Sequence, residues 1–147
     1  MNTVTLPEGY TVSCDPARLD INVIHGFLSQ SYWAKSIPRV LVEKSIRHSL
    51  CWGVYHHAAQ IGFARVITDK ATFAYLCDVF ILPEHRGKGL SKALVATILA
   101  HPDLQGLRRW MLVTADAQSL YEPFGFRAAA HPERHMEIHR PGMYEGA

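Results

Sequence analysis

The sequence of 147 residues has few cysteines and no long apolar run, and both absences exclude classes of protein. Its three cysteines, Cys14, Cys51 and Cys77, are odd in number, widely spaced and form no CxxC pair. A disulfide scaffold is therefore not expected, and a reducing, cytoplasmic location is predicted. The longest apolar run, 93–100, is interrupted by Thr97 and is too short to cross a bilayer. The N-terminus has no apolar stretch typical of a secretory signal.

A strong excess of one charge is also lacking. Fifteen Lys and Arg residues face thirteen Asp and Glu residues, and this net charge of +2 indicates neither a nucleic-acid partner nor a membrane surface. The content of 48% hydrophobic and 19% charged residues is typical of a globular protein. Because no repeat, low-complexity tract or Gly/Ser-rich linker divides the chain, residues 1–147 are predicted to form a single domain.

The spacing of apolar residues predicts an α/β (α+β) fold. Helices are expected after a cap at Asp15 or Asp20, from Pro38 onward, over 90–99 and over 118–124. Alternating and β-branched residues predict strands over 10–14, 51–57, 60–68, 72–82, 109–114, 126–129 and 135–139. The resulting order, β-α-α-β-β-β-α-β-α-β-β, predicts a mixed, mostly antiparallel sheet of about seven strands with helices on both faces.

The segment 79–99 carries the clearest chemical signal. An apolar strand leads into a loop that contains Gly87 and Gly89, and a helix follows at once. The first amides of a helix lack internal acceptors, its dipole adds partial positive charge, and glycine lets a ligand approach the backbone. With the charges of Arg86 and Lys88, this junction suits a pyrophosphate; the alternative is that the glycines form only a turn. The patterns GxxxxGK[ST] and GxGxxG are both absent.

Two motifs in this chain resemble those of the GNAT superfamily of acetyltransferases. The run 79–94, with R-G-K-G-L-S at its centre, is similar to the coenzyme A motif Gln/Arg-x-x-Gly-x-Gly/Ala. Arg86 and Gly89 match that motif, and Ser91 replaces its last Gly or Ala. The run 120–126, LYEPFGF, resembles the family's LYxxxGF signature, and the predicted order of elements is also that of the family.

The resemblance implies a map of the acetyl-CoA site. The backbone of Val79, Phe80 and Ile81 would bind the pantetheine arm. Tyr121 would protonate the departing thiolate; the alternative is a ring that packs under its helix. Many members carry an Asn before this Tyr, and here Thr114, Asp116 or Gln118 would take its place. The amides that would hold the pyrophosphate belong to Arg86, Gly87, Lys88, Gly89, Leu90 and Ser91.

The acceptor side of the predicted site depends on residues outside the two motifs. Asp78 lies in an apolar run, where an unpaired carboxylate is costly, so it is a candidate base or a partner for a substrate ammonium. The alternative is a structural Asp whose carboxylate is satisfied by Arg65 or by backbone amides. His25, Tyr32, Trp33 and Arg65 are candidates for the acceptor pocket, with ordinary packing as the alternative for the first three, and Arg65 could also hold an acidic group of the substrate.

These residues predict an enzyme that transfers an acetyl group from acetyl-CoA to the amine of a small-molecule or amino-acid-like acceptor. The alternatives are a non-catalytic acyl-CoA sensor and a peptide or protein N-acetyltransferase. A homodimer through a sheet edge or the C-terminal segment is plausible. No metal is expected: His131, His135 and His139 are spaced by four, but Pro132 disfavours the helix that would align them.

Overall fold

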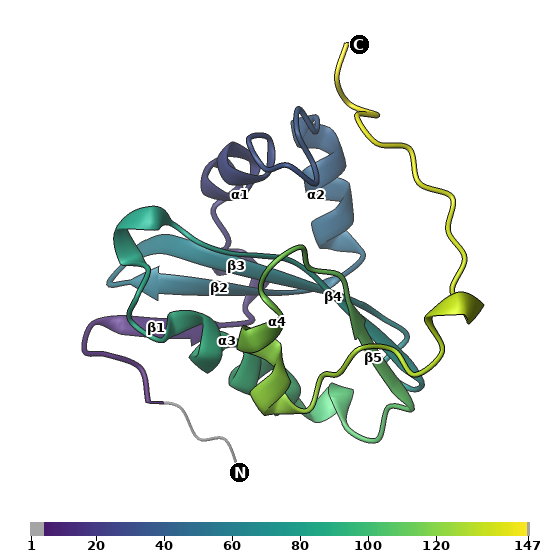
Figure 1. The fold of residues 1–147 in the computed structure, drawn as a ribbon. Helices are drawn as coiled ribbons and strands as arrows, with labels where there is room; N and C mark the ends of the chain where they lie inside the picture. The colour runs from purple at the N-terminus through teal and green to yellow at the C-terminus, as the bar shows by residue number, and fades with distance from the viewer. Residues whose placement is uncertain (1–4, 147) are drawn as a thin grey trace.

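The computed structural model describes residues 5–146, and a five-stranded sheet lies at its centre (Figure 1). The strands follow the order β1-β2-β3-β4-β5. The first four pair antiparallel, whereas β4 and β5 run parallel because α3 connects them. The strands span Tyr10–Ser13 (β1), Leu50–His56 (β2), Ala59–Thr68 (β3), Phe73–Ile81 (β4) and Arg109–Leu112 (β5).

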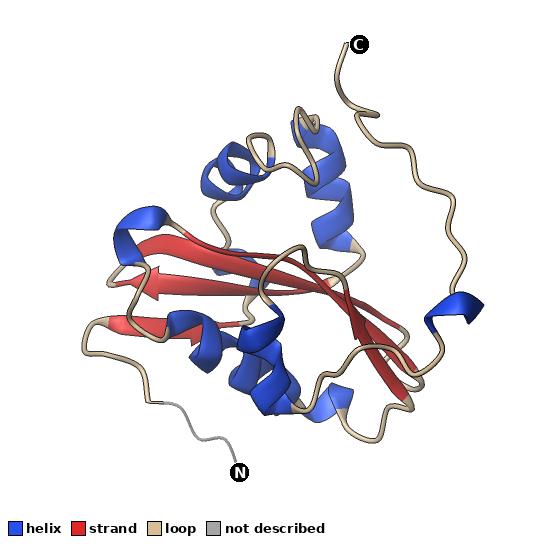
Figure 2. Cartoon of the chain, viewed as in Figure 1, coloured by secondary structure: helices blue, strands red, loops and turns tan. Residues whose placement is uncertain are grey.

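Helices cover both faces of this sheet, with α1 and α2 on one side and α3 and α4 on the other (Figures 1 and 2). They span Ile21–Leu28 (α1), Arg39–Arg47 (α2), Leu90–Leu99 (α3) and Gln118–Tyr121 (α4). None of the helices within residues 5–146 is long and apolar enough to span a membrane. The predicted fold class, a mixed and mostly antiparallel sheet between helices, is therefore confirmed.

Local sequence explains where the first two helices begin. The Asp20 carboxylate accepts a hydrogen bond of 3.0 Å from the amide of Asn22 and caps α1. Asp15 caps a preceding 3-10 turn, Pro16–Arg18, in the same way, so both candidate caps are used. Pro38 stands immediately before α2, where its missing N–H removes no helical hydrogen bond.

Two apolar clusters hold the layers together, one on each face of the sheet. Ile24 and Val42 of α1 and α2 pack with Phe63 and Phe80 of β3 and β4. On the other face, α3 contributes a buried stripe that packs on β2, β3 and β4. That stripe consists of Leu90, Leu94, Val95 and Ile98.

The predictions of strands over 126–129 and 135–139 are wrong. Residues 127–143 are all exposed, and within the described chain they contain only a 3-10 turn, Pro132–Arg134. Met136 and Ile138 alternate with polar residues as in a strand, but a strand forms only where a neighbouring edge supplies hydrogen-bond partners. This part of the chain reaches no such edge of its own sheet, so the sheet has five strands instead of about seven.

Candidate active site

The site begins where β4 and β5 part. β4 pairs with β5 only from Phe73 to Leu76, opposite Arg109 to Leu112. Within the described residues, the backbone of 77–81 therefore has no strand partner on its β5 side. Val79, Phe80 and Ile81 all belong to this free stretch of backbone, as the predicted pantetheine site requires. An edge of this kind offers N–H and C=O groups to a ligand.

A bulge marks one end of this free edge. The pairing of β3 with β4 shifts register between Phe63 and Arg65, opposite Asp78. Asp78 has a φ of +56°, in the left-handed region that non-glycine residues rarely adopt. Such backbone strain persists only where the surroundings hold it, and it concentrates at functional sites. The bulge thus directs the Asp78 side chain at the point where β4 leaves β5.

The loop after β4 lies at the other end of the free edge. Its first turn, Pro83–His85, is tied back by Arg86, whose Nε donates to the Ile81 carbonyl at 2.8 Å. Gly87 and Gly89 have φ values of +80° and +75°, which only glycine adopts readily. A Cβ at either position would meet no atom within 4 Å, so both glycines face open space. A ligand can approach the backbone here.

The amides of this loop and of the first turn of α3 remain available. In the described chain, none of the amides from Gly87 to Lys92 donates to a protein acceptor, and no side chain caps α3. Leu90 is buried and fixes the start of the helix, whereas Lys88 is exposed and Ser91 is half-buried. The result is a row of free donors at a helix N-terminus, which favours a phosphate group.

Tyr121 ends α4 and is 93% shielded from solvent, with its ring edge-on to Phe126 at 5.9 Å between centroids. Within residues 5–146, the Tyr121 hydroxyl has no hydrogen-bond partner. Every fully buried polar side-chain atom in this part of the chain has a partner, so the Tyr121 hydroxyl is not fully buried and must reach solvent. Burial raises the pKa of the Tyr121 phenol. The phenol therefore stays protonated at neutral pH and has a proton to give.

Three predicted residues from distant parts of the chain meet at the bulge. The indole Nε1 of Trp33 donates to Asp78 Oδ1 at 2.9 Å, and the Arg65 Nε donates to Asp78 Oδ2 at 2.9 Å. A second nitrogen of Arg65 donates to the Ser49 hydroxyl at 3.1 Å. The Arg65 and Asp78 side chains are only 17% and 11% exposed. Both oxygens of the carboxylate are thus engaged in a mostly buried network.

Comparisons with known proteins agree on the family. A sequence model described as the acetyltransferase (GNAT) domain matches residues 47–128. A protein of Gibberella zeae that carries an acetyltransferase name is 34% identical over 149 residues, which is 82% of this chain and 83% of that protein. The chain belongs to the GNAT family of acetyltransferases. It is therefore an acyltransferase.

Crystal structures of other GNAT proteins share the fold. One, described as an acetyltransferase of the GNAT family from Xanthomonas campestris pv. campestris, is 54% identical, with a TM-score of 0.92 over 96% of this chain and 99% of that one. Another, a GNAT acetyltransferase from Elizabethkingia anophelis with acetyl-CoA bound, is 13% identical, with a TM-score of 0.65 over 92% of each chain.

The residues expected to replace the family's Asn have local contacts in this GNAT chain. Thr114 Oγ1 accepts a hydrogen bond of 3.0 Å from the amide of Ala117, and its carbonyl accepts one of 3.3 Å from Gln118. These bonds order the turn that leads into α4. Asp116 lies exposed on that turn. A role of Thr114 or Asp116 toward the coenzyme stays a prediction.

The remaining candidates for the acceptor pocket differ in position. His25 Nε2 donates to the Ile37 carbonyl at 3.0 Å, which ties α1 to the loop before α2, the packing role foreseen as its alternative. Tyr32 is 74% exposed and lies edge-on to Trp33, with 5.1 Å between centroids. Phe27 of α1, which no motif in the sequence marks as a site residue, stacks on Phe80 with 4.0 Å between ring centroids and adjoins Trp33. Its helical spacing signalled burial and nothing more.

Cysteine chemistry at this GNAT site is disfavoured. Cys77 lies next to Asp78, and Cys51 pairs across β2 and β3 with Arg65. Burial, together with a smaller contribution from the charge of Asp78 and against the opposing effect of Arg65, raises the pKa of both thiols to about 12. Both groups therefore remain protonated thiols, which are poor nucleophiles.

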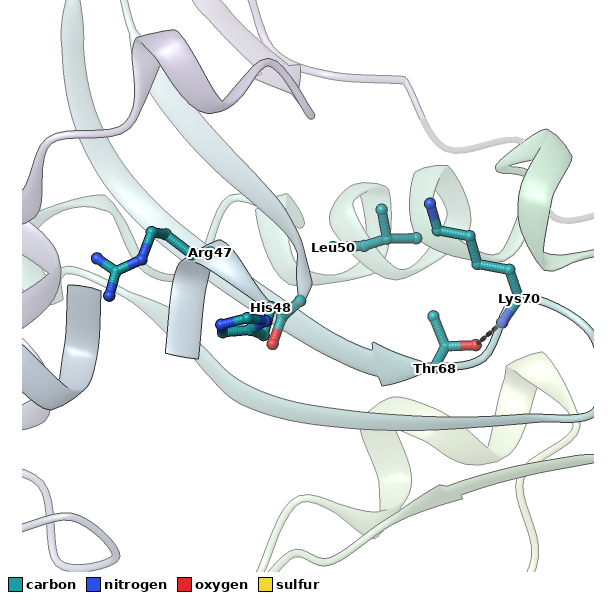
Figure 3. Close-up of a pocket in the computed structure, with 6 residues that line it drawn as sticks. Arg47, His48, Leu50, Thr68 and Lys70 are labelled. Carbon is teal, nitrogen blue, oxygen red and sulfur yellow. Dashed lines mark hydrogen bonds between the residues drawn. The ribbon is translucent and has the colours of Figure 1, made fainter. Parts of the chain in front are cut away.

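A second pocket lies between the end of α2 and the β3–β4 turn (Figure 3), and it reaches the Arg65 network at Ser49. Its volume of about 240 Å³ is lined by Arg47, His48, Ser49, Leu50, Thr68 and Lys70. The Arg47 guanidinium points away from Lys70 in this view, and Lys70 approaches Asp103 at 3.9 Å. Because its cationic groups do not converge, this pocket has no arrangement suited to catalysis.

Proposed function

We propose that this GNAT enzyme transfers an acetyl group from acetyl-CoA to the amine of a small-molecule or amino-acid-like acceptor, and that residues 1–147 form one catalytic domain. The observation that carries the proposal is the row of free amides from Gly87 to Lys92, beside the free edge of β4. The acetyl-CoA bound to the Elizabethkingia anophelis relative supports the choice of donor.

The coenzyme is proposed to bind mainly to backbone. Its pyrophosphate would accept hydrogen bonds from the loop amides, with Gly87 and Gly89 leaving the space for it. The cations of Arg86 and Lys88 add charge of the complementary sign. The pantetheine arm would then run back along Val79–Ile81 and place its thioester near the Asp78 bulge.

The reaction is a direct acyl transfer. The lone pair of the neutral amine attacks the acetyl carbon, the new C–N bond forms, and the C–S bond breaks with its electron pair on sulfur. The amine releases one proton to solvent water, and the thiolate gains one, which Tyr121 is proposed to supply. A thiol has a pKa of ~8.5 and a phenol a pKa of ~10, so proton transfer from the phenol to the thiolate is uphill in free energy. Burial of the Tyr121 phenol raises its pKa and makes this transfer more unfavourable. Tyr121 must therefore donate as charge develops on sulfur and regain its proton from solvent.

Asp78 is proposed to hold and orient the acceptor amine. Its two oxygens already accept from Trp33 and Arg65, so its negative charge is fixed in place at the bulge. A carboxylate held in this way attracts an ammonium group, and it keeps lone pairs that can accept from an amine N–H. The other role predicted for Asp78 is that of the base that removes the amine proton. In that role, replacement of Asp78 should remove the acidic limb of the pH–rate profile.

A small acceptor is favoured by what surrounds Asp78. Trp33 donates directly to the carboxylate, and its ring adjoins those of Tyr32 and Phe27. These rings come from α1 and the loop after it, so they stand over one side of the bulge. They would pack on the carbon skeleton of an amine and leave little room for a folded polypeptide.

The decisive experiment follows thiol release from acetyl-CoA over a panel of amines, amino acids and peptides, with coenzyme binding measured by calorimetry. We expect saturable binding of acetyl-CoA and turnover of at least one small amine. Turnover of peptides alone would overturn the proposed acceptor class. Binding with no turnover of any amine would favour a sensor.

A further inference from the structure

Three imidazole rings gather at one end of the sheet, beside the loop that precedes α3. His56 ends β2, His57 follows it in the turn to β3, and His85 ends the first turn of the loop. The ring centroid of His56 lies 4.4 Å from that of His57 and 5.3 Å from that of His85. In Figure 1 the β2–β3 turn and this loop lie side by side. These three residues, the histidine cluster, therefore border the row of available amides that begins at Gly87.

The first strand fixes the orientation of two of the rings. The Tyr10 ring stacks on His56 with 4.6 Å between centroids, and its hydroxyl is hydrogen-bonded to His85 Nδ1 at 2.7 Å. In the described chain, no protein group bonds to the other ring nitrogen of His85, Nε2. When the Tyr10 hydroxyl donates to Nδ1, the neutral ring carries its proton on Nε2, and the charged ring carries one there as well. Nε2 is therefore a donor that a ligand can use.

The third ring is also held in place by the backbone. The His57 amide donates to the Gly9 carbonyl at 2.8 Å, and His57 has a φ of +55°, which non-glycine residues rarely adopt. A Cβ at Gly9 would lie only 3.1 Å from the His57 ring, so the glycine leaves room for that ring. His57 is exposed, whereas His56 and His85 are half-buried. A ligand can therefore reach a cluster that the fold has already ordered.

The surroundings of the histidine cluster are cationic. Within residues 5–146, no carboxylate forms an ion pair with these rings, and the neighbouring acidic residues Glu8 and Glu84 are exposed. The loop adds the cations of Arg86 and Lys88. Partial desolvation, followed by the charges of the other two imidazoles and of Lys88, lowers the pKa of His56. An anion placed among these groups would offset their mutual repulsion.

We infer that the histidine cluster and Lys88 bind a phosphomonoester, and that the coenzyme supplies it as the 3′-phosphate of its ribose. The inference rests on the proposed coenzyme site, because coenzyme A carries this phosphate a few bonds from the pyrophosphate. A phosphomonoester is mainly a dianion above pH ~6, and imidazolium and ammonium groups are strong donors to it. Tyr10 would act as a positioning residue, since it orients His85 without reaching the ligand.

The inference fixes the sign of a pH effect on coenzyme binding. A bound dianion favours the charged form of each imidazole, so it raises the pKa of the histidine cluster and binding takes up protons. Because an ordinary histidine has a pKa of ~6.5, the affinity for coenzyme A should rise as the pH falls from ~8 to ~6. A coenzyme that lacks the 3′-phosphate should not show this rise.

The first test compares coenzyme A with 3′-dephospho-coenzyme A by calorimetry at pH ~6.5 and pH ~8. At the lower pH, coenzyme A should bind about 10-fold more tightly, and the difference should shrink at the higher pH. Buffers with different heats of ionisation should reveal proton uptake with coenzyme A only. Equal affinities at both pH values, or an affinity that falls on acidification, would overturn the inference and leave the proposed function standing. Binding of neither coenzyme would overturn the proposed coenzyme site as well.

The second test removes two of the imidazoles in the variant His57→Gln/His85→Gln. Most of the difference between the two coenzymes should disappear, while the Kd for 3′-dephospho-coenzyme A should stay unchanged. His48→Gln/His139→Gln, which alters two exposed histidines elsewhere, is the matched control and should retain the difference. Because His85 belongs to the loop, an equal loss of affinity for both coenzymes would mean a distorted loop and would count against a phosphate site.

A third measurement distinguishes the coenzyme from free phosphate as the source of the anion. Imidazole proton resonances of the histidine cluster are followed during titration with inorganic phosphate. They should respond in the protein alone and in its complex with 3′-dephospho-coenzyme A, but not in its complex with coenzyme A. A response that persists with coenzyme A bound would assign the cluster to free phosphate and overturn the coenzyme assignment.

Discussion

The two sides of the candidate site are built in different ways. On the coenzyme side, the donors are consecutive backbone amides, held by Gly87, Gly89 and the buried Leu90. On the acceptor side, Trp33, Arg65 and Asp78 come from a loop and two strands, and they meet through side-chain hydrogen bonds. The first side is a property of one continuous segment. The second exists only when the chain is folded.

This difference teaches how each side can be changed. A site made of backbone amides should tolerate many side-chain substitutions around it, because the amides remain in place. Only a bulky side chain at Gly87 or Gly89, which would block the approach of the ligand, should destroy it. A site made of side chains depends on charges and donors, so conservative substitutions should alter it step by step.

The largest effect is expected from Gly89→Trp. The indole would occupy the open space beside the loop, so acetyl-CoA binding should be lost and kcat/KM should fall to about 1% of its original value or less. Gly106→Trp is the matched control, since Gly106 also has a positive φ, +74°, and open space around it. Calorimetry with acetyl-CoA measures both. Unchanged affinity in Gly89→Trp would contradict the coenzyme map.

Tyr121→Phe should come next. Removing the hydroxyl should lower kcat about 100-fold while the Kd for acetyl-CoA changes little, because a general acid acts on the transition state. Tyr75→Phe serves as control, since Tyr75 is half-buried and burial likewise raises its pKa. Steady-state kinetics with a saturating acceptor tests the pair. An equal kcat in both variants would assign Tyr121 a packing role.

Asp78→Asn should destabilise the protein by about 3 kcal/mol, because it leaves the buried Arg65 without its counter-charge. Asp103→Asn, which removes an exposed partner of Lys70, should cost about 1 kcal/mol or less. Urea unfolding compares the two. In activity, a positioning role predicts a higher acceptor KM with the acidic limb of the pH–rate profile retained. Loss of that limb would instead identify Asp78 as the base.

Trp33→Phe removes a single donor from the acceptor side and keeps an aromatic ring. Loss of one hydrogen bond to a carboxylate should raise the acceptor KM about five-fold and leave the Kd for acetyl-CoA unchanged. Tyr32→Phe, a change in the same exposed loop, removes a hydroxyl that touches neither Asp78 nor Arg65. If Trp33→Phe changed the Kd for acetyl-CoA as much as the acceptor KM, the coenzyme side and the acceptor side of the site would not be separable.

The smallest expected effect is the response to alkaline pH. Burial raises the pKa of Tyr121, so its phenol should stay protonated up to the ordinary tyrosine range near ~10. Folding favours the neutral form of the Tyr121 phenol. Any contribution of this group to the free energy of unfolding is therefore lost only as the pH rises above the pKa that the phenol has in the unfolded chain. We expect no fall in kcat from Tyr121 below about pH 10. Difference absorbance of tyrosinate between the parent chain and Tyr121→Phe checks the assignment.

Much of the molecule follows from the sequence by itself. The caps at Asp15 and Asp20, the antiparallel strands β2 to β4 and the glycine loop before α3 were all predictable, because each depends on residues adjacent in the chain. The positive φ of Gly87 and Gly89 and the free amides after them follow in the same way from local backbone sterics and from the start of a helix. Short-range rules are sufficient wherever the partners of an interaction are neighbours in sequence.

Only the tertiary structure decided the rest. The sequence offered Arg65 or a substrate amine as partners of Asp78, and the fold brings Arg65 and Trp33 to it together. In the folded protein, residues 126–129 and 135–139 form no strands, although Met136 and Ile138 have the spacing of a strand. The physical reason is common to both cases. A side-chain network and a β-strand each need partners from elsewhere in the chain, and no local pattern of residues says whether those partners are within reach.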